Sequence, residues 1–592
     1  MYDPRFYATR LPICICALRL AGALCALVTL AACGGGGGDT ADSQAAAATP
    51  SSASTPTPTP TPTSAAAPTP VAAADAARLL EQATFGVTAS DVAHVQSLGI
   101  DAYINEQLAY PPTQYTGYSY TPHTAQVNCR SDGSNPPDAS SLCARDRYSP
   151  FQVQRDFFTH ALINPDQLRQ RVAFAFSQIM VVSSIEIYEA YGLAAYQNIL
   201  LTDALGNYRT LLQDVVLSPT MGHYLDMAGS DKTNPQNGTV PNQNLAREVL
   251  QLFSIGLFQL NPDGTQQLDA SGEPIPTFDG ATIEGFSAVL TGWTYPSLPG
   301  VNPQWTNPTN LEGTMVAFAD HHESGTKALL NGYTVPANQT PAQDLADALD
   351  NIFNHPNVGP FIGRQLIQHL VTSNPSPAYV ERVAAVFADN GKGVRGDLSA
   401  VVRAILTDPE ARGTSPASNV FGHLREPALF ITSALRSLSG QSDGVLLSAA
   451  SSAMGEPIFS PDTVFDFYPP SYQIPGTQTV APELGIDNAA TALARANFIN
   501  TMIMQGGAAP EASVTGSTGT TINLAPLAAA GNNTTLIAQL NQVLMHGSLP
   551  SDACNVILAA ADSVAAKSPD PLAAARAASY LILTSAQYQV ER

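Results

Sequence analysis

The sequence predicts a mainly α-helical protein, built as one large multi-helix domain with long loops rich in glycine and proline, after a disordered N-terminal tether. Apolar residues recur at helical spacing over most of the chain from Asp75 onward. Hydrophobic residues make up 44% of the chain and charged residues only 12%, so a large core can form and few charges are available to cover it. Residues 1–74 have a different composition, and the predicted domain therefore spans residues 75–592.

The first 32 residues are typical of a secretion signal. Three arginines precede an apolar run, 21–32, that is too short to cross a bilayer of roughly 30 Å. The run ends in Leu-Ala-Ala-Cys, which resembles the bacterial lipobox, where the cysteine receives lipid through its thiol. We expect Cys33 to become the lipidated first residue of the mature chain. The alternative is an ordinary signal peptide followed by an incidental cysteine.

Residues 33–74 form the predicted tether. Five successive glycines and a Thr-Pro repeat at 55–63 cannot build a core and should be extended. Gly35 stands where an aspartate would favour retention in the inner membrane, so we expect an outer-membrane anchor. The domain would then face the periplasm or the cell surface. No later stretch holds 18 uninterrupted apolar residues, so we predict no further membrane span.

Charge and cysteine content limit the possible partners. The net charge of −22 would repel phosphate backbones, which argues against nucleic acid as a partner. Cys129 and Cys143 form a local pair that we expect to be a disulfide in an oxidising compartment. Cys554 is left over and is expected to be buried.

Amphipathic helices are predicted in order along the domain. Their expected ranges are 168–182, 244–258, 344–353, 358–371, 378–388, 397–407, 425–438 and 571–588. Between 260 and 342 we expect long loops with one helix at 283–290. Residues 455–487 hold six prolines and residues 510–533 are small and polar, so both are expected to be loops.

Eight stretches along the domain match, in order, those of a known family. They are 78–86, 166–172, 242–248, 291–293, 322–327, 355–356, 361–366 and 580–585. In these stretches the chain resembles the bacterial family of unknown function DUF1800, over about residues 75–592. The resemblance implies a secreted or anchored, mostly helical protein without a settled activity. It also implies a sulfatase-like protein as a possible partner, since members are often encoded beside such a family.

The chain departs from the family pattern at two positions. Phe253 stands where many members carry histidine, and Glu323 follows His322 where many carry aspartate. The loss of a histidine from the central helix puts a metal site there in doubt.

Glu248 and Arg171 are the first candidate catalytic residues. Glu248 lies on the apolar side of its predicted helix, where an unpaired carboxylate costs several kcal/mol. It could act as a general base with a raised pKa. Arg171 could bind an anionic substrate group. The alternative for Glu248 is a buried ion pair with an arginine, of which Arg171 is one candidate, that fastens two helices. The alternative for Arg171 is that it satisfies carbonyl oxygens at the C-terminus of a helix, or a carboxylate.

The segment 320–323, Asp-His-His-Glu, followed by Lys327, is the densest polar cluster. Histidine nitrogen and carboxylate oxygen are ordinary ligands of zinc or iron. His322 and Glu323 are therefore candidate ligands of a divalent metal, and His322 is a third candidate catalytic residue. A polar loop with solvated histidines is the alternative.

Three further positions receive structural interpretations. His369 is expected to be exposed, and His423 with Glu426 has helical i, i+3 spacing. Asp397 is expected to cap the N-terminus of the helix that follows it.

No signature of a known enzyme class is present. The sequence lacks His-Glu-x-x-His, Gly-x-Ser-x-Gly, a phosphate loop and a dinucleotide fingerprint. One prediction is a non-enzymatic envelope protein that binds or organises a partner protein or glycan, with Glu248, Arg171 and His322 apart. The other is an extracytoplasmic hydrolase acting on surface or environmental polymers, with these residues within about 6 Å in a pocket.

Overall fold

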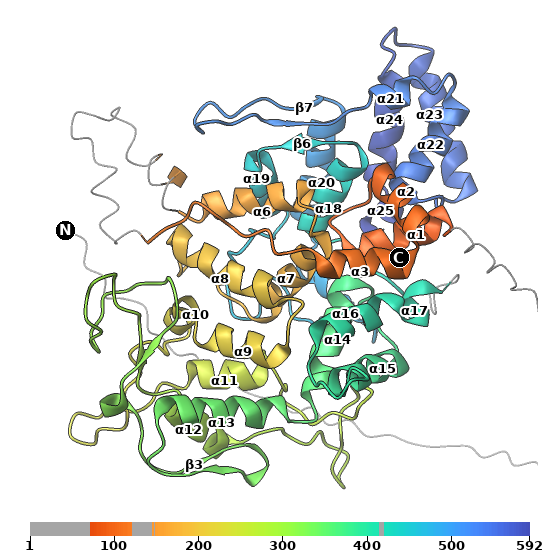
Figure 1. Cartoon of the computed structure of the whole chain (residues 1–592). Helices are drawn as coiled ribbons and strands as arrows, with labels where there is room; N and C mark the ends of the chain where they lie inside the picture. Colours follow the sequence, from red (N-terminus) through yellow and green to blue (C-terminus); the bar gives the residue numbers. More distant parts are fainter. Residues whose placement is uncertain (1–70, 121–141, 143–144, 147–148, 414–419, 592) are drawn as a thin grey trace, which may run out of the picture. The chain divides into compact units, whose positions relative to one another are not determined.

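The computed structural model describes residues 71–120, 142, 145–146, 149–413 and 420–591. They belong to the compact unit Pro68–Arg592. This part of the chain is mainly α-helical, as predicted, with a few two-residue strands (Figure 1). The predicted lipidation site Cys33, the predicted disulfide Cys129–Cys143 and residues 33–70 of the tether lie outside the described residues.

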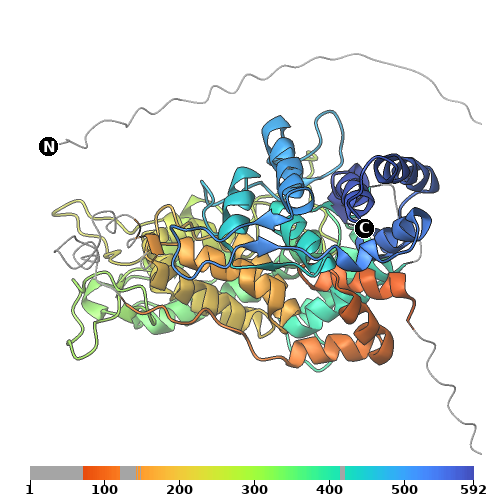
Figure 2. The ribbon, with the colours of Figure 1, turned by 90° about the horizontal axis from the view of Figure 1, so that it is seen from above.

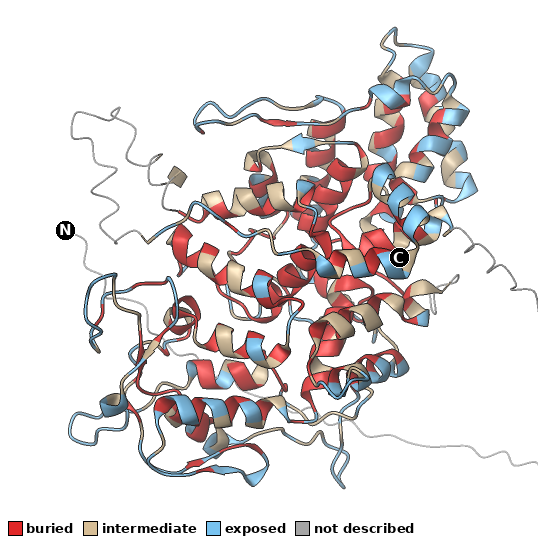
Figure 3. Cartoon of the chain, in the orientation of Figure 1, coloured by how far each residue is buried: buried red, intermediate tan, exposed pale blue. Residues whose placement is uncertain are grey.

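Helix α7 (Gln167–Ile179) occupies the interior, and every one of its residues is buried. It contacts α3 (Ile100–Ala109), α6 (Phe151–Ile163), α8 (Ala190–Asp203) and α14 (Val358–Leu370). A helix buried on all sides has no solvent face for polar residues, so each arginine and glutamine in it needs a protein partner. Figure 3 shows this buried interior in red.

The helices predicted between 344 and 407 are present with clear start signals. They are α13 (Pro341–Phe353), α14, α15 (Pro377–Ala388) and α16 (Leu398–Thr407). Thr340 forms a capping box with Gln343 at the start of α13. Asp397 accepts a hydrogen bond from the backbone N–H of Ala400, which confirms it as the N-cap of α16.

Three predicted helices have different bounds. The helix expected over 244–258 stops as α11 (Asn244–Gln251), and the chain turns at Gly256, whose φ is +73°. A side chain at Gly256 would collide with the ring of Phe361, so this close approach requires glycine. The C-terminal helix divides into α24 (Ala573–Leu583) and α25 (Ala586–Gln589) because Ser585 caps a new turn.

The third revised helix is α18, which begins only at Pro427 and ends at Ser437. The residues before it form strand β5 (His423–Leu424), which pairs antiparallel with the C-terminal strand β9 (Val590–Glu591). The expected helical i, i+3 relation of His423 and Glu426 is therefore wrong. The tertiary pairing with β9 draws His423 into a strand.

The expected loop regions are ordered around short strands. The helix expected at 283–290 is α12 (Gly280–Val289), and antiparallel pairs join β1 (Trp293–Thr294) to β2 (Val316–Ala317) and β3 (Lys327–Ala328) to β4 (Thr334–Val335). Region 510–533 contributes β8 (Thr520–Thr521) to a three-stranded sheet of order β6-β8-β7, with β6 at Gln441–Ser442 and β7 at Gly507–Ala508.

The remaining elements complete the described chain. The other helices are α1 (Ala73–Ala83), α2 (Ala89–Leu98), α9 (Tyr208–Val216), α10 (Pro219–Tyr224), α17 (Pro409–Arg412), α19 (Val445–Ala453), α20 (Ala489–Ile503), α21 (Ala525–Ala528), α22 (Asn533–Met545) and α23 (Ser551–Ala565), with 3₁₀ turns at Ala319–His321, Leu330–Gly332 and Pro482–Gly485. Helices α22, α23 and α24 pack on one another and lie near α1 (Figures 1 and 2).

One continuous apolar core extends from α1 to Tyr588. Cys554 is a free thiol and is half-buried, not fully buried as expected. Within the described residues, no helix is both long and apolar enough to cross a membrane.

Candidate functional site

Arg171 lies in the buried helix α7, with only 1% of its surface exposed. Its Nη2 donates a hydrogen bond of 3.1 Å to the carbonyl oxygen of His369. Its Nη1 lies 3.8 Å from Oε1 of Glu426. Arg171 thus contacts a carbonyl oxygen in the last turn of α14 and a carboxylate, as its structural interpretation expected, but that carboxylate is Glu426 at the start of α18 and not Glu248.

Glu248 is half-buried on α11, beside exposed Arg247. Burial raises the pKa of Glu248, and the nearby Arg247 opposes this only in part. Its Oε2 is buried and has no hydrogen-bond partner among the described residues. Glu248 thus has the raised pKa expected of a general base, but no described partner that would orient it.

His322 is buried between two fixed partners. Its Nδ1 lies 2.8 Å from the carbonyl oxygen of Thr291, and its Nε2 lies 2.9 Å from Oδ2 of Asp344. Nζ of Lys327 lies 2.6 Å from the same carboxylate oxygen. Because both ring nitrogens are occupied, this cluster fastens the loop to α13.

Glu323 faces elsewhere, and its Oε2 accepts a hydrogen bond from the backbone N–H of Thr233 at 3.3 Å. No group of three or more His, Cys, Asp or Glu side chains in the described ranges could hold a metal ion. The predicted metal pair His322 and Glu323 therefore has no ligand set in this part of the chain. Glu248, Arg171 and His322 each have their own surroundings, and no described contact joins them.

Glu426 is the centre of a buried polar network. Its Oε2 accepts hydrogen bonds from Nε2 of Gln178 at 2.9 Å and from the hydroxyl of Tyr468 at 2.6 Å. Arg171 approaches its other oxygen. All four side chains are buried, so the network fixes Gln178 and Tyr468 in position.

His423 connects this region to the C-terminus. Its Nδ1 lies 3.4 Å from Oε1 of Glu483, and its Nε2 lies 3.7 Å from Oε1 of Glu591. Burial alone would lower the pKa of His423, but the carboxylates of Glu591 and Glu483 outweigh it and raise the pKa to about 10. His423 is therefore a buried cation at neutral pH.

A hollow of about 420 Å³ opens beside this network, and we call it the glutamine pocket. The end of α7, the turn after α11, one side of α14 and the segment 464–471 form its walls. Five glutamines share the lining: Gln178, Gln251, Gln266, Gln365 and Gln368. Four aromatic rings accompany them: Phe258, Phe361, Phe465 and Tyr468.

Titratable groups in the glutamine pocket are mostly neutral. Burial raises the pKa of Asp466 well above its usual range, the backbone of Phe467 opposes this in part, and the charge of Glu426 adds to it. His369 is half-buried, not exposed as expected, and burial lowers its pKa to about 4. Asp466 also has a strained backbone, with φ of +60°, and its Oδ2 has no described hydrogen-bond partner.

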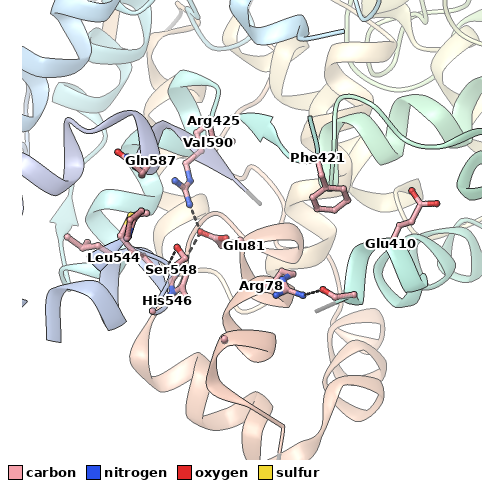
Figure 4. A pocket seen from close by; sticks show the side chains of 15 residues that line it. Arg78, Glu81, Glu410, Phe421, Arg425, Leu544, His546, Ser548, Gln587 and Val590 are labelled. Carbon is pink, nitrogen blue, oxygen red and sulfur yellow. Dashed lines mark hydrogen bonds and ion pairs between the residues drawn. The ribbon is translucent and has the colours of Figure 1, made fainter. Parts of the chain in front are cut away.

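A second hollow, of about 430 Å³, is lined by α1, the end of α22 and strand β9 (Figure 4). In it, Glu81 bonds to Arg425 and lies 3.1 Å from Nε2 of His546. Burial would raise the pKa of Glu81, but Arg425 and His546 outweigh it and lower the pKa to about 2. These ions satisfy one another, which is typical of a structural cluster.

The sequence indicated some of these residues and missed others. The sequence indicated Arg171, His423 and Glu426, because charged residues are scarce in this chain and each one within an apolar region is therefore informative. Asp466, Tyr468 and Glu483 were missed because the proline-rich segment around them has no periodic pattern. The one feature of the sequence that could have indicated these residues was the presence of an acidic or phenolic side chain within a proline-rich segment.

The described domain is thus a mainly helical scaffold that buries a network of ion pairs and carries one pocket lined by amides and aromatic rings. The chain belongs to the DUF1800 family: the family model, described as a protein of unknown function, matches residues 78–590. No curated protein and no solved structure matches the chain.

Proposed function

We propose that this chain is a lipid-anchored protein of the cell envelope that binds a glycan in the glutamine pocket. The observation that supports this most is the combination of five glutamines with four aromatic rings in one hollow. A sugar ring presents apolar C–H faces and a rim of hydroxyls, so it suits a site of aromatic surfaces and side-chain amides. A pocket of this volume lies in the usual range for small ligands.

The pocket combines fixed and available polar groups. The amide of Gln178 is held by Glu426 and Tyr468. The side chains of Gln251 and Gln266 have no hydrogen-bond partner among the described residues, so they can serve ligand hydroxyls. Phe465 is 47% exposed at the pocket and offers a ring face for stacking.

The envelope location is supported by the N-terminal sequence, with its lipobox-like Leu-Ala-Ala-Cys33 and its long tether. The outer membrane is part of the proposal because Gly35 stands two residues after Cys33, and a sulfatase-like partner is part of it through the family resemblance. Such a partner would act on the same glycan.

Calorimetric titration of the full-length lipidated protein, in neutral detergent, tests the glycan site. Neutral xylo-, cello- and manno-oligosaccharides and envelope glycans serve as probes. Phe465→Ala should weaken binding about tenfold, or about 1.4 kcal/mol. Tyr333→Ala is the matched control, because Tyr333 is 43% exposed and lies outside the pocket lining. Equal affinities of the wild type and Phe465→Ala would contradict the proposal.

A second function is favoured by Asp466. A carboxylic acid whose pKa is raised by burial, in a sugar-sized pocket, resembles the general acid of glycoside hydrolysis, which supports the alternative of an extracytoplasmic hydrolase. Incubation with the bound oligosaccharide should then release reducing ends, and Asp466→Asn should abolish the release while binding persists. If the bound sugar stays intact over days, the hydrolase alternative is contradicted and the glycan-binding function remains.

A further inference from the structure

Arg364 is a charged residue of the glutamine pocket without a protein partner. It is half-buried on α14, among the residues that line the hollow. In the part of the chain that the structure describes, no carboxylate pairs with its guanidinium and no hydrogen bond reaches it. Burial lowers the pKa of Arg364, and no neighbouring charge takes part in that shift. An arginine nevertheless stays protonated in a protein.

Two buried arginines near the core each reach a carboxylate. Arg171 contacts Glu426 and a carbonyl oxygen, and Arg436 bonds to Asp91 and to the carbonyl oxygen of Leu162. A guanidinium that is partly removed from water without a partner costs free energy. An anionic group of a ligand would offset that cost. The chain has only 26 lysines and arginines in 592 residues, so an arginine in a pocket without a counter-charge is uncommon here.

The rest of the pocket does not cancel this charge. Burial lowers the pKa of His369 to about 4, so this ring is neutral at pH 7. Burial raises the pKa of Asp466 well above its usual range, which favours its uncharged form. The carboxylate of Glu483 lies 3.4 Å from Nδ1 of His423. Arg364 is the one lysine or arginine among the described residues that line the glutamine pocket, and neither acid of this lining contacts it.

We propose that Arg364 forms an anion-binding subsite of the glutamine pocket, which binds the carboxylate of an acidic sugar such as a uronic acid. This inference rests on the proposed glycan site. The planar guanidinium can donate two parallel hydrogen bonds to a carboxylate. One cation suits one carboxylate on an otherwise uncharged glycan, whereas a highly charged polyanion would be repelled by a chain whose net charge is −22.

The test compares two ligands that differ in one charge. Aldotetraouronic acid, a xylotriose bearing one glucuronic acid, and its methyl ester are titrated calorimetrically into the full-length lipidated protein in neutral detergent. We expect the wild type to bind the acid at least tenfold more tightly than the ester. Arg364→Gln should lose this preference and keep its affinity for the ester, and Arg364→Lys should retain part of the preference. Circular dichroism checks that each variant is folded.

Arg403→Gln is the control, since Arg403 contacts Asp101 and Asn105 outside the pocket. It should leave both affinities unchanged. Equal affinity of the wild type for acid and ester, or a preference that survives in Arg364→Gln, would overturn the subsite and leave the glycan site standing. Failure of both sugars to bind at millimolar concentration would count against the glycan site itself. Tighter binding of an acetylated tripeptide with a free C-terminus would also overturn it, in favour of protein termini.

Discussion

At the scale of single residues, buried charged and polar side chains in this protein contact one another. Oδ2 of Asp344 lies 2.9 Å from Nε2 of His322 and 2.6 Å from Nζ of Lys327, and all three side chains are buried. Each of these groups would be too costly in the core alone, but together they compensate one another. The cluster connects the loop before β3 to helix α13.

Removal of the shared carboxylate should therefore be severe. Asp344→Ala leaves the buried ammonium of Lys327 without its counter-charge and should lower the free energy of unfolding by about 3–5 kcal/mol. Urea unfolding followed by circular dichroism measures the change. Asp347→Ala, on the same helix, is the control and should cost less than about 1 kcal/mol. A loss of similar size in both variants would show that the cluster contributes little.

The raised pKa of His423 predicts a pH dependence of stability. Its pKa rises from 6.5 to about 10 on folding, so its contribution is full below about pH 6.5 and is lost as the pH rises towards 10. Stability should fall by roughly 2–4 kcal/mol across this range. His423→Gln should flatten the profile in urea unfolding, whereas replacement of the exposed His94 should leave its slope unchanged. An unaltered slope in His423→Gln would exclude His423 as the source.

At the scale of elements, close packing and strand pairing set the positions of the helices and strands. Helix α12 packs so tightly on β3 that a Cβ at Gly285 would overlap the carbonyl oxygen of Ala328. Gly280 begins the same helix with no atom within 4 Å of such a Cβ. The two glycines therefore provide an internal comparison.

Gly285→Ala should lower the free energy of unfolding by at least about 2 kcal/mol, because α12 must move away from β3. Gly280→Ala should be neutral or slightly stabilising. Thermal unfolding of both variants checks this difference. Similar melting temperatures for the two would mean that the contact between α12 and β3 yields easily.

The C-terminal strand β9 supplies Glu591 to the buried ions. This carboxylate lies near His423 and 3.9 Å from Nε of Arg425, which in turn bonds to Glu81. Glu591→Gln keeps the shape but removes the charge, so it should lower the free energy of unfolding by about 3 kcal/mol. Glu381→Gln on the exposed face of α15 should have no measurable effect. Equal stability of both variants by urea unfolding would contradict a role for β9 in fastening the fold.

At the scale of the whole molecule, the chain combines one large core with a predicted lipid anchor. The core buries apolar side chains from helices throughout residues 73–591. The candidate glycan site lies on this core, and the segment 33–74 precedes it in the sequence as the predicted tether from Cys33.

The anchor predicts a definite mature terminus. Mass spectrometry of the purified protein should find a chain that begins at an acylated Cys33, and Cys33→Ala should release the protein from membranes. An unmodified N-terminus at any other residue would contradict lipidation.

The sequence by itself determined the helical class, the family, the approximate starts of the helices α13 to α16 and the cap at Asp397, because helical periodicity and capping are local properties of the chain. It also showed that charges in the core must be matched. Only the tertiary structure decided which charge meets which: Arg171 meets Glu426 rather than Glu248, and His322 meets Asp344. His322 and Asp344 are 22 residues apart in the sequence, and Arg171 and Glu426 are 255 apart. Tertiary packing brings each pair together, so no local sequence pattern predicts them. The glutamine pocket follows the same rule, since its lining comes from segments far apart in the sequence and exists only once α7, α11 and α14 have packed.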